Sequence, residues 1–189
     1  MTKIVVWCRH NEDNIIGIGA KIPWHISSDF KRFRKITESE NLVVGEKTYE
    51  SFPNRTLPNR NIHILTLNSD YEVSDNAKHF VHNNIADFKD FEQDLYICGG
   101  ATIYKLFMTS GNKLMPDVIV DSCYMGDIDN LEGQKINITP CVEIMQKLYQ
   151  KVSPDYEQEN VLTSIWIKKG DFIEQEVLKK LIKIISINH

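Results

Sequence analysis

The sequence predicts a layered α/β domain with a mostly parallel central sheet, helices on both of its faces and an antiparallel edge near the C-terminus. Short β-branched runs alternate with amphipathic helical segments over the first 125 residues, which is the order that builds parallel sheets. Two late strand-like runs, 117–125 and 161–169, follow one another without a predicted helix, which favours an antiparallel edge. The 189 residues, 42% of them hydrophobic, suit a single domain with its own core.

Several short runs rich in β-branched and aromatic residues have the length of strands. They are residues 3–8, 41–45, 61–67, 79–82, 94–100, 117–125 and 161–169. Segments with apolar residues at helical spacing predict helices over residues 29–36, 46–52, 84–91 and 101–110. Ser27 or Ser28 is expected to cap the first of these helices. The glycine-spaced stretch 15–24 and the proline-punctuated stretch 53–60 are predicted loops.

Residues 171–189 are predicted to form an amphipathic helix appended to a domain of residues 1–170. Asp171 and Glu174 have the spacing of a capping box, and Val177 and Leu181 continue an apolar stripe. Three interpretations stay open: the helix packs on its own domain, binds a partner or second copy of the chain, or lies on a membrane surface. We expect a monomer, with a dimer through this helix as the alternative.

Composition and charge argue against several classes of protein. The net charge is −4 and the pI about 5.9, with no stripe of lysine or arginine of the kind that binds nucleic acid. No apolar run approaches the roughly 20 residues that cross a bilayer. The start MTKIVVWCRHNED lacks the pattern of a signal peptide. We therefore expect a cytoplasmic protein with no nucleic-acid or membrane partner.

The cysteines and histidines predict no metal site. Cys8, Cys98, Cys123 and Cys141 are far apart and form no CxxC pair, so buried reduced thiols are expected. The two histidines of HFVH, residues 79–82, are expected on a strand.

Two predicted strands run into helices through glycines. Gly45 precedes the segment EKT, and the pair Gly99–Gly100 precedes the helix that begins near residue 101. Ligands of α/β sheets bind at the carboxyl ends of strands, where helix N-termini offer free N–H groups and glycines admit a phosphate. Two such junctions suit the pyrophosphate of a dinucleotide, although the GxGxxG fingerprint is absent.

One acid has an unusual position. Asp29 is followed by Phe33 at four residues and Ile36 at seven, so it shares the apolar face of its helix. An acid in the first turn of a helix is favoured by the helix dipole alone, which is one explanation. The other is that a carboxylate on a buried face needs a partner, such as a ligand with two adjacent N–H donors.

Three stretches together resemble the dihydrofolate reductase family. They are IIGIGAKIPWHISSDFKRF, VVGEKTYESFPNRTLPNR and YICGGATIYKLF, and their order and spacing match that family over residues 3–127 and more loosely to about 169. The resemblance implies hydride transfer from NADPH to dihydrofolate, giving tetrahydrofolate. It also implies that antifolates with a protonated diaminopyrimidine bind the same acid.

The resemblance assigns a role to each matching residue. Asp29 matches the acid that holds ring N3 and the 2-amino group of the pterin, while water delivers a proton to N5. The residues implied in catalysis are Asp29, Ile22, Trp24 and Tyr104. The implied substrate-binding residues are Trp7, Cys8, Asp29, Phe30, Phe33, Phe52, Leu57, Arg60, Cys98 and Asp121, with Arg60 for the glutamate α-carboxylate. The implied cofactor-binding residues are Cys8, Ile16, Gly17, Lys21, Gly45, Glu46, Lys47, Thr48, Leu65, Thr66, Leu67, Cys98, Gly99, Gly100, Ala101, Thr102, Ile103 and Tyr104.

The chain departs from the family pattern where the 2′-phosphate of NADPH is usually held. Glu46, Leu67 and Thr102 stand where the family has basic or polar residues. An acid repels a phosphate but accepts hydrogen bonds from ribose hydroxyls. We therefore expect a weakened preference for NADPH and use of NADH, unless Lys47 or Arg32 restores the phosphate site.

A second departure lies in the run DVIVDSC. Asp121 aligns with a threonine that hydrogen-bonds the active-site acid in the family. Two carboxylates so close together would not both ionise easily, so the pKa of one of them would rise. In the alternative register, shifted by one residue, Ser122 supplies the hydroxyl.

Two other functions are weighed against this one. A reductase of the same fold could act on a different pterin or a pyrimidine, which Asp121 and Glu46 would favour and Arg60 opposes. A non-catalytic binding protein of this fold is opposed by Asp29, Trp24 and the glycines.

Overall fold

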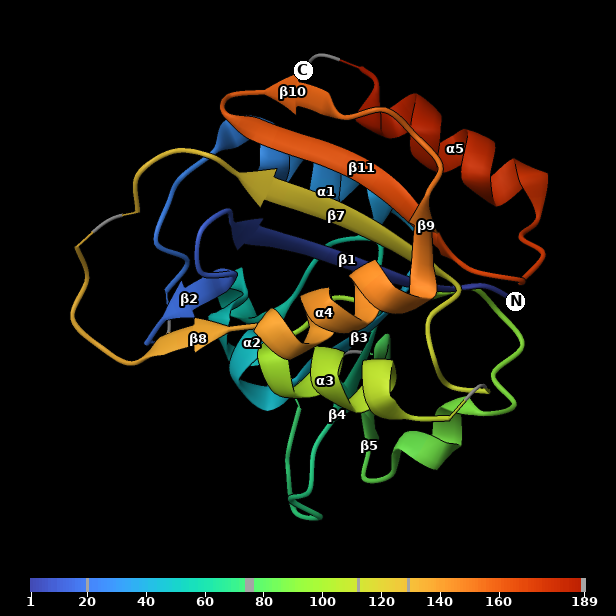
Figure 1. The fold of residues 1–189 in the computed structure, drawn as a ribbon. Helices are drawn as coiled ribbons and strands as arrows, with labels where there is room; N and C mark the ends of the chain where they lie inside the picture. The colour runs from blue at the N-terminus through green and yellow to red at the C-terminus, as the bar shows by residue number, and fades with distance from the viewer. Residues whose placement is uncertain (20, 74–76, 112, 129, 188–189) are drawn as a thin grey trace.

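The computed structural model describes residues 1–19, 21–73, 77–111, 113–128 and 130–187. Its main sheet has nine strands in these ranges, with eight in the order β10-β11-β7-β1-β6-β3-β4-β5 and β9 beside β11 (Figure 1). The strands are β1 (Lys3–His10), β3 (Asn41–Gly45), β4 (Asn61–Leu65), β5 (His79–His82), β6 (Leu95–Ile97), β7 (Val118–Tyr124), β9 (Tyr149–Lys151), β10 (Tyr156–Gln158) and β11 (Val161–Lys168). A separate two-stranded sheet pairs β2 (Ile15–Ile18) with β8 (Lys135–Asn137).

The helices are α1 (Ser27–Ile36), α2 (Glu46–Ser51), α3 (Ala101–Thr109), α4 (Thr139–Leu148) and α5 (Gln175–Ile185). Two short 3₁₀ helices, η1 (Pro53–Arg55) and η2 (Ile85–Phe88), complete the described elements.

The strand directions confirm the predicted sheet. The strands from β5 through β4, β3, β6 and β1 to β7 are all parallel. The late strand β11 then pairs antiparallel with β7, and both β9 and β10 pair antiparallel with β11. The antiparallel edge is therefore at the C-terminal side of the sheet, as the adjacent late strands indicated.

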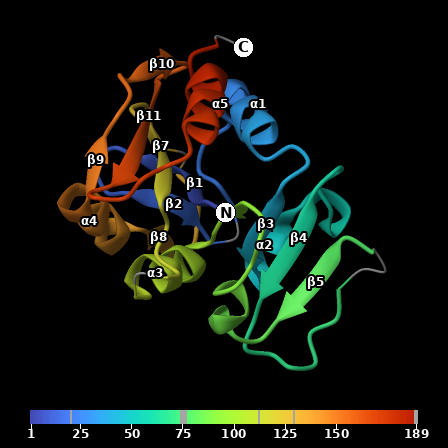
Figure 2. The ribbon, with the colours of Figure 1, turned by 90° about the vertical axis from the view of Figure 1, so that its right-hand side faces the viewer.

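Side chains alternate between two cores along each central strand. In β1, Val5 and Trp7 belong to a cluster with α3 and α4, whereas Ile4 and Val6 belong to a cluster with residues of α1, α2 and α5. Figures 1 and 2 show α3 and α4 on one side of the sheet and α1 and α5 on the other. We call these the α3 face and the α1 face.

Several expected elements were wrong, one of them because its partner is distant in sequence. The stretch 15–24 is not all loop, because Ile15–Ile18 pairs with β8 about 120 residues later as β2. Residues 84–91 hold only the short 3₁₀ helix η2. Helix α4, which lies between the two late strands, was not predicted.

The predicted helix caps were also wrong. The N-cap of α1 is Ile26, and neither Ser27 nor Ser28 caps it. Instead, the carboxylate of Glu159, in the turn between β10 and β11, accepts the backbone N–H of Ser28 at 2.8 Å. The N-cap of α5 is Glu174, without a side-chain cap bond, so the capping box is not formed.

Helix α5 packs against its own chain. Val177, Leu181 and Ile185 are buried in the core of the α1 face, and Figure 2 shows α5 alongside α1. The ammonium group of Lys180 pairs with Glu40, near the end of the loop after α1. Packing on the same domain was the first of the three interpretations.

The described residues contain no cluster of three or more histidine, cysteine or acidic side chains arranged to hold a metal ion. The four cysteines are free thiols, three of them buried. Among the described helices, none has both the length and the apolar character needed to cross a membrane.

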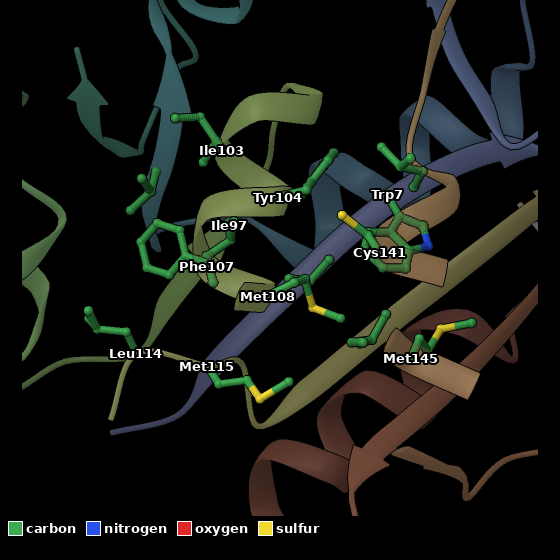
Figure 3. Close-up of a cluster of buried hydrophobic side chains, with 14 of the residues drawn as sticks. Trp7, Ile97, Ile103, Tyr104, Phe107, Met108, Leu114, Met115, Cys141 and Met145 are labelled. Atoms are coloured by element: carbon green, nitrogen blue, oxygen red, sulfur yellow. The ribbon is translucent and has the colours of Figure 1, made fainter. Parts of the chain in front are cut away.

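Asp121 lies on the α3 face, which corrects the register in which it faces Asp29. Its carboxylate accepts the indole N–H of Trp7 at 2.6 Å and two N–H groups of Arg9 at 2.9 Å. Trp7 in turn packs edge-on against Tyr104, with ring centroids 5.5 Å apart, within the cluster that Figure 3 shows. Asp121 therefore neutralises a largely buried guanidinium and satisfies a buried indole.

We predict that Asp121→Ala destabilises the protein by about 3 kcal/mol or more, because it leaves Arg9 and Trp7 without their acceptor in a nearly buried site. Urea unfolding of the variant against the parent measures this. Asp127→Ala, at an exposed position just after β7, is the matched control and should change the free energy of unfolding by less than about 0.5 kcal/mol. A loss below about 1 kcal/mol for Asp121→Ala would show that the network is not needed.

Candidate active site

The first turn of α1 brings Asp29 against the end of the sheet. Its side chain is 19% exposed, which agrees with its predicted place on the apolar face of the helix. Opposite it are Cys8 of β1 and Ser122 of β7, which are paired neighbours in the parallel ladder. Both donate hydrogen bonds to the Asp29 carboxylate. Ser122 also exchanges a hydrogen bond of 3.0 Å with Thr163 of β11.

Alternation along β7 explains which residue serves Asp29. Val118 and Val120 belong to the α1 face and Ile119 to the α3 face, so Ser122 faces α1 and Asp121 faces α3. The register shifted by one residue is thus the one that the structure has. The site contains one carboxylate rather than two.

Burial raises the pKa of the Asp29 carboxyl to about 6, while Arg32 and the hydrogen bonds from Cys8 and Ser122 act in the opposite direction. The charge of Asp29 and burial together raise the pKa of the Cys8 thiol, so this cysteine stays protonated and donates. The arrangement leaves a carboxylate that is ionised above about pH 6 and still accepts hydrogen bonds.

Sequence reasoning did not find Arg32 and Glu159 as members of this site. Arg32 is 1% exposed, and its Nη1 lies 3.9 Å from Oδ1 of Asp29. The spacing of three residues from Asp29 was the available signal, since such residues are neighbours on a helix. Glu159 could not have been found, because its contact with α1 spans 131 residues.

Trp24 and Ile22 lie in the loop between β2 and α1. Trp24 is buried with Ile26 and Val161, and its ring lies 5.2 Å from that of Tyr124. Ile22 is 50% exposed. The tryptophan therefore anchors the loop, while the isoleucine is free to meet a ligand.

The resemblance implies an apolar wall around the substrate, and the residues named for it differ in burial. Phe33, Phe52 and Leu57 are half-buried at the edge of the core of the α1 face, and Phe30 is 41% exposed. The substrate role implied for Trp7 is wrong, because its side chain is buried on the α3 face and cannot line this wall. Asp121 is excluded from the wall for the same reason.

Arg60 is nearly buried at the start of β4. Its two Nη groups donate to the carbonyls of Pro58 and Arg34, and its Nε has no hydrogen-bond partner among the described residues. The guanidinium is thus held in place by backbone carbonyls.

The two glycine junctions lie side by side. The N–H of Gly45, at the end of β3, donates to the carbonyl of Gly99 at 2.8 Å. The Gly99–Gly100 peptide is cis, and Gly99 has φ of +104°. A Cβ on Gly99 would lie 2.9 Å from the Tyr104 hydroxyl, and one on Gly100 would lie 3.3 Å from that of Thr48. Gly99 therefore has to be glycine, a side chain at Gly100 would have to displace Thr48, and the backbone at the start of α3 is left open to a phosphate.

The other implied cofactor residues divide by burial. Leu65, Ile103 and Tyr104 are buried, and the Tyr104 hydroxyl donates to the carbonyl of Val6 at 2.8 Å. Cys98 is buried on the α1 face. Lys21, Lys47 and Thr102 are exposed, while Ile16, Thr48 and Ala101 are partly buried and Gly17 is buried.

Glu46 and Thr66 meet beside the junction at Gly45. The Thr66 hydroxyl donates a hydrogen bond to the Glu46 carboxylate, and Leu67 next to it is 97% exposed. Arg32 is buried beside Asp29, so it does not restore a phosphate site here. Lys47 is the nearest lysine in sequence that is exposed.

Comparison with known proteins gives one consistent result. The family model described as dihydrofolate reductase matches residues 3–136. The dihydrofolate reductase of Enterococcus faecium is 32% identical over 126 residues, which are 66% of this chain and 74% of the relative. That of Mycoplasma pneumoniae is 29% identical over 130 residues, covering 65% of this chain and 78% of the relative.

A solved structure has the same fold. It is the dihydrofolate reductase of Enterococcus faecalis in complex with NADP(H) and RAB-propyl, with a TM-score of 0.71 and 24% identity. The match covers 89% of this chain and 96% of that one. The family model spans most of the chain, including Asp29, both glycine junctions and Ser122, and so the chain belongs to the dihydrofolate reductase family.

Proposed function

We propose that Asp29 is the group through which this dihydrofolate reductase binds and activates its substrate. The observation that carries the proposal is a single, largely buried carboxylate, held by Cys8 and Ser122 and bordered by apolar side chains. A carboxylate accepts two N–H donors side by side, the pattern that ring N3 and the 2-amino group of a pterin present.

The reaction adds a hydride to C6 of dihydrofolate and a proton to N5, and a reduced nicotinamide supplies the hydride when bound. Asp29 orients the ring and favours positive charge on it, so that N5 takes up its proton from water more readily. Ile22, which is exposed on its loop, is proposed to close over the ligand and exclude further water. Arg60 is proposed to pair with the glutamate α-carboxylate of the substrate.

The cofactor is proposed to lie along the carboxyl ends of β3 and β6. The side-chain-free junction at Gly99 and Gly100 fits a pyrophosphate, and the N-terminal N–H groups of α3 would hold it. We propose NADPH as a hydride donor and NADH as an accepted alternative. Support for the alternative is the carboxylate of Glu46, which accepts hydrogen bonds from ribose hydroxyls and repels a 2′-phosphate.

The other candidate, a reductase of this fold for a pyrimidine or another pterin, loses its best support. Part of that support was a second carboxylate beside Asp29, and Asp121 is on the opposite face of the sheet. Glu46, the other part, bears on the cofactor site rather than on the acid.

We also propose that residues 1–170 form the catalytic domain and residues 171–189 an extension that covers α1, with the chain acting as a monomer. Support is the apolar stripe of α5, which is already buried against its own core. A cytoplasmic location is proposed from the four free thiols, which are typical of reducing compartments. Antifolates are expected to bind at Asp29.

The first prediction from this proposal concerns turnover. Asp29→Asn is expected to lower kcat/KM for dihydrofolate by about 100-fold or more, because the amide carries no charge to stabilise the protonated ring. The assay follows the loss of reduced-nicotinamide absorbance. Asp90→Asn, an exposed acid, is the control and should turn over like the parent. Equal turnover of Asp29→Asn and the parent would contradict the proposal.

The second prediction concerns stability and pH. The pKa of Asp29 is raised in the folded state, from 3.8 to about 6, so the carboxylate's charge destabilises the protein as pH rises through this range. Asn has no such charge, so Asp29→Asn should be more stable than the parent by up to about 3 kcal/mol at about pH 8. The two should converge near about pH 3.5 when urea unfolding is measured without ligands. A difference that does not depend on pH would refute the assignment.

The third prediction concerns the cofactor. Glu46→Arg is expected to raise the preference for NADPH over NADH in kcat/KM by about tenfold or more, because it replaces repulsion of the 2′-phosphate with a charge-assisted hydrogen bond. Calorimetry should show the same gain in affinity for adenosine 2′,5′-bisphosphate over 5′-AMP, without any turnover. Glu50→Arg, which makes the same charge change one turn along α2, should leave both ratios unchanged. A parent protein that already prefers NADPH strongly would contradict the proposal that NADH is an accepted alternative.

A further inference from the structure

Arg32 is an unusual neighbour for the acid of a pterin site. It lies one turn after Asp29 on the same face of α1, and only 1% of it is exposed. Its Nη2 is 3.5 Å from the side-chain oxygen of Gln158, at the end of β10. Its Nε and Nη1 have no hydrogen-bond partner among the described residues.

A buried guanidinium needs an opposite charge near it, because removing it from water is costly. Asp29 supplies that charge at 3.9 Å, a distance too long for a direct hydrogen bond but short for two unit charges. Glu159 adds a weaker attraction from the β10–β11 turn. The positive charge of Arg32 therefore acts mainly on Asp29.

The other groups around Asp29 do not duplicate this effect. From β1 and β7 it is faced by the Cys8 thiol and the Ser122 hydroxyl, both neutral donors. Tyr104 lies on the α3 face. Its hydroxyl stays neutral because burial raises its pKa, and the charge of Asp29 adds a small further rise. Among the described residues that act on the Asp29 carboxyl, Arg32 is the one cation.

We propose that Arg32 is a positioning residue of the pterin site, whose buried guanidinium holds Asp29 ionised and opposes ligands that carry their own positive charge. This inference rests on the proposed role of Asp29. A pterin with a 4-oxo group is neutral and binds the carboxylate through N–H groups alone. A 2,4-diaminopteridine gains a ring proton when it pairs with a carboxylate, and a cation nearby makes that proton harder to hold.

Two matched ligands test the proposal without cofactor or turnover. They are 6,7-dimethylpterin, which is neutral, and 2,4-diamino-6,7-dimethylpteridine, which accepts a ring proton. Calorimetric affinities for both are measured against pH for the parent, Arg32→Met, Arg32→Gln and Arg32→Lys. Arg34→Met is the matched control, because it removes the same charge from an exposed position on the same helix.

In Arg32→Met and Arg32→Gln, affinity for the diaminopteridine relative to the pterin should rise about tenfold at neutral pH. The pH below which pterin binding weakens should rise by about one unit, since Asp29 would hold its proton longer. Arg32→Lys should retain much of the parent's behaviour, and Arg34→Met all of it. Folded neutral variants with the parent's ratio and the parent's pH dependence would overturn the proposal.

A measurement on the parent alone keeps the test open if both neutral variants fail to fold. The ring pKa of the bound diaminopteridine, read from its ultraviolet spectrum, should exceed that of the free ligand by less than about one unit. A rise of about three units or more would overturn the proposal, because it would show an acid whose charge is not offset. A parent protein that does not turn over dihydrofolate would instead count against the proposed function.

Discussion

The site depends on the contact of α1 with the ends of β1 and β7. That contact places one carboxylate, Asp29, on the buried side of the helix opposite a thiol and a hydroxyl from two neighbouring strands. Desolvation makes the charge costly, and the hydrogen bonds and the nearby arginine make it tolerable. The substrate and cofactor roles proposed for the other residues all depend on this charge.

Because side chains alternate along the central strands, the two faces of the sheet have different roles. Residues that point toward α1 build the substrate side, and residues that point toward α3 build a sealed core in which Trp7, Arg9 and Asp121 satisfy one another. The junction where the cofactor is proposed to bind lies at the ends of β3 and β6, where glycines leave the backbone without side chains. One strand can thus serve binding on one side and stability on the other.

Much of this could be predicted from local pattern. The offsets of Asp29, Phe33 and Ile36 located the acid on an apolar face. The strand-to-helix glycines marked two junctions that the structure brings side by side, and both signals are local in the chain. The pairing of β2 with β8, the cap from Glu159 and the choice between Asp121 and Ser122 could not be read in the same way. Each depends on a partner more than 100 residues away or on a register that a single step reverses. The effect of Arg32 was missed because its burial, rather than its spacing, makes it matter.

The bond between Glu159 and Ser28 has a consequence for the order in which the chain is made. Asp29 emerges early in synthesis, but its partner Ser122 of β7 and the turn at Glu159 come from much later parts of the chain. Contacts of such long range close late, since the intervening chain must be ordered first. A nascent chain that ends before β7 therefore carries Asp29 without the hydrogen bond from Ser122, and the N-terminus of α1 is held only after the β10–β11 turn has folded.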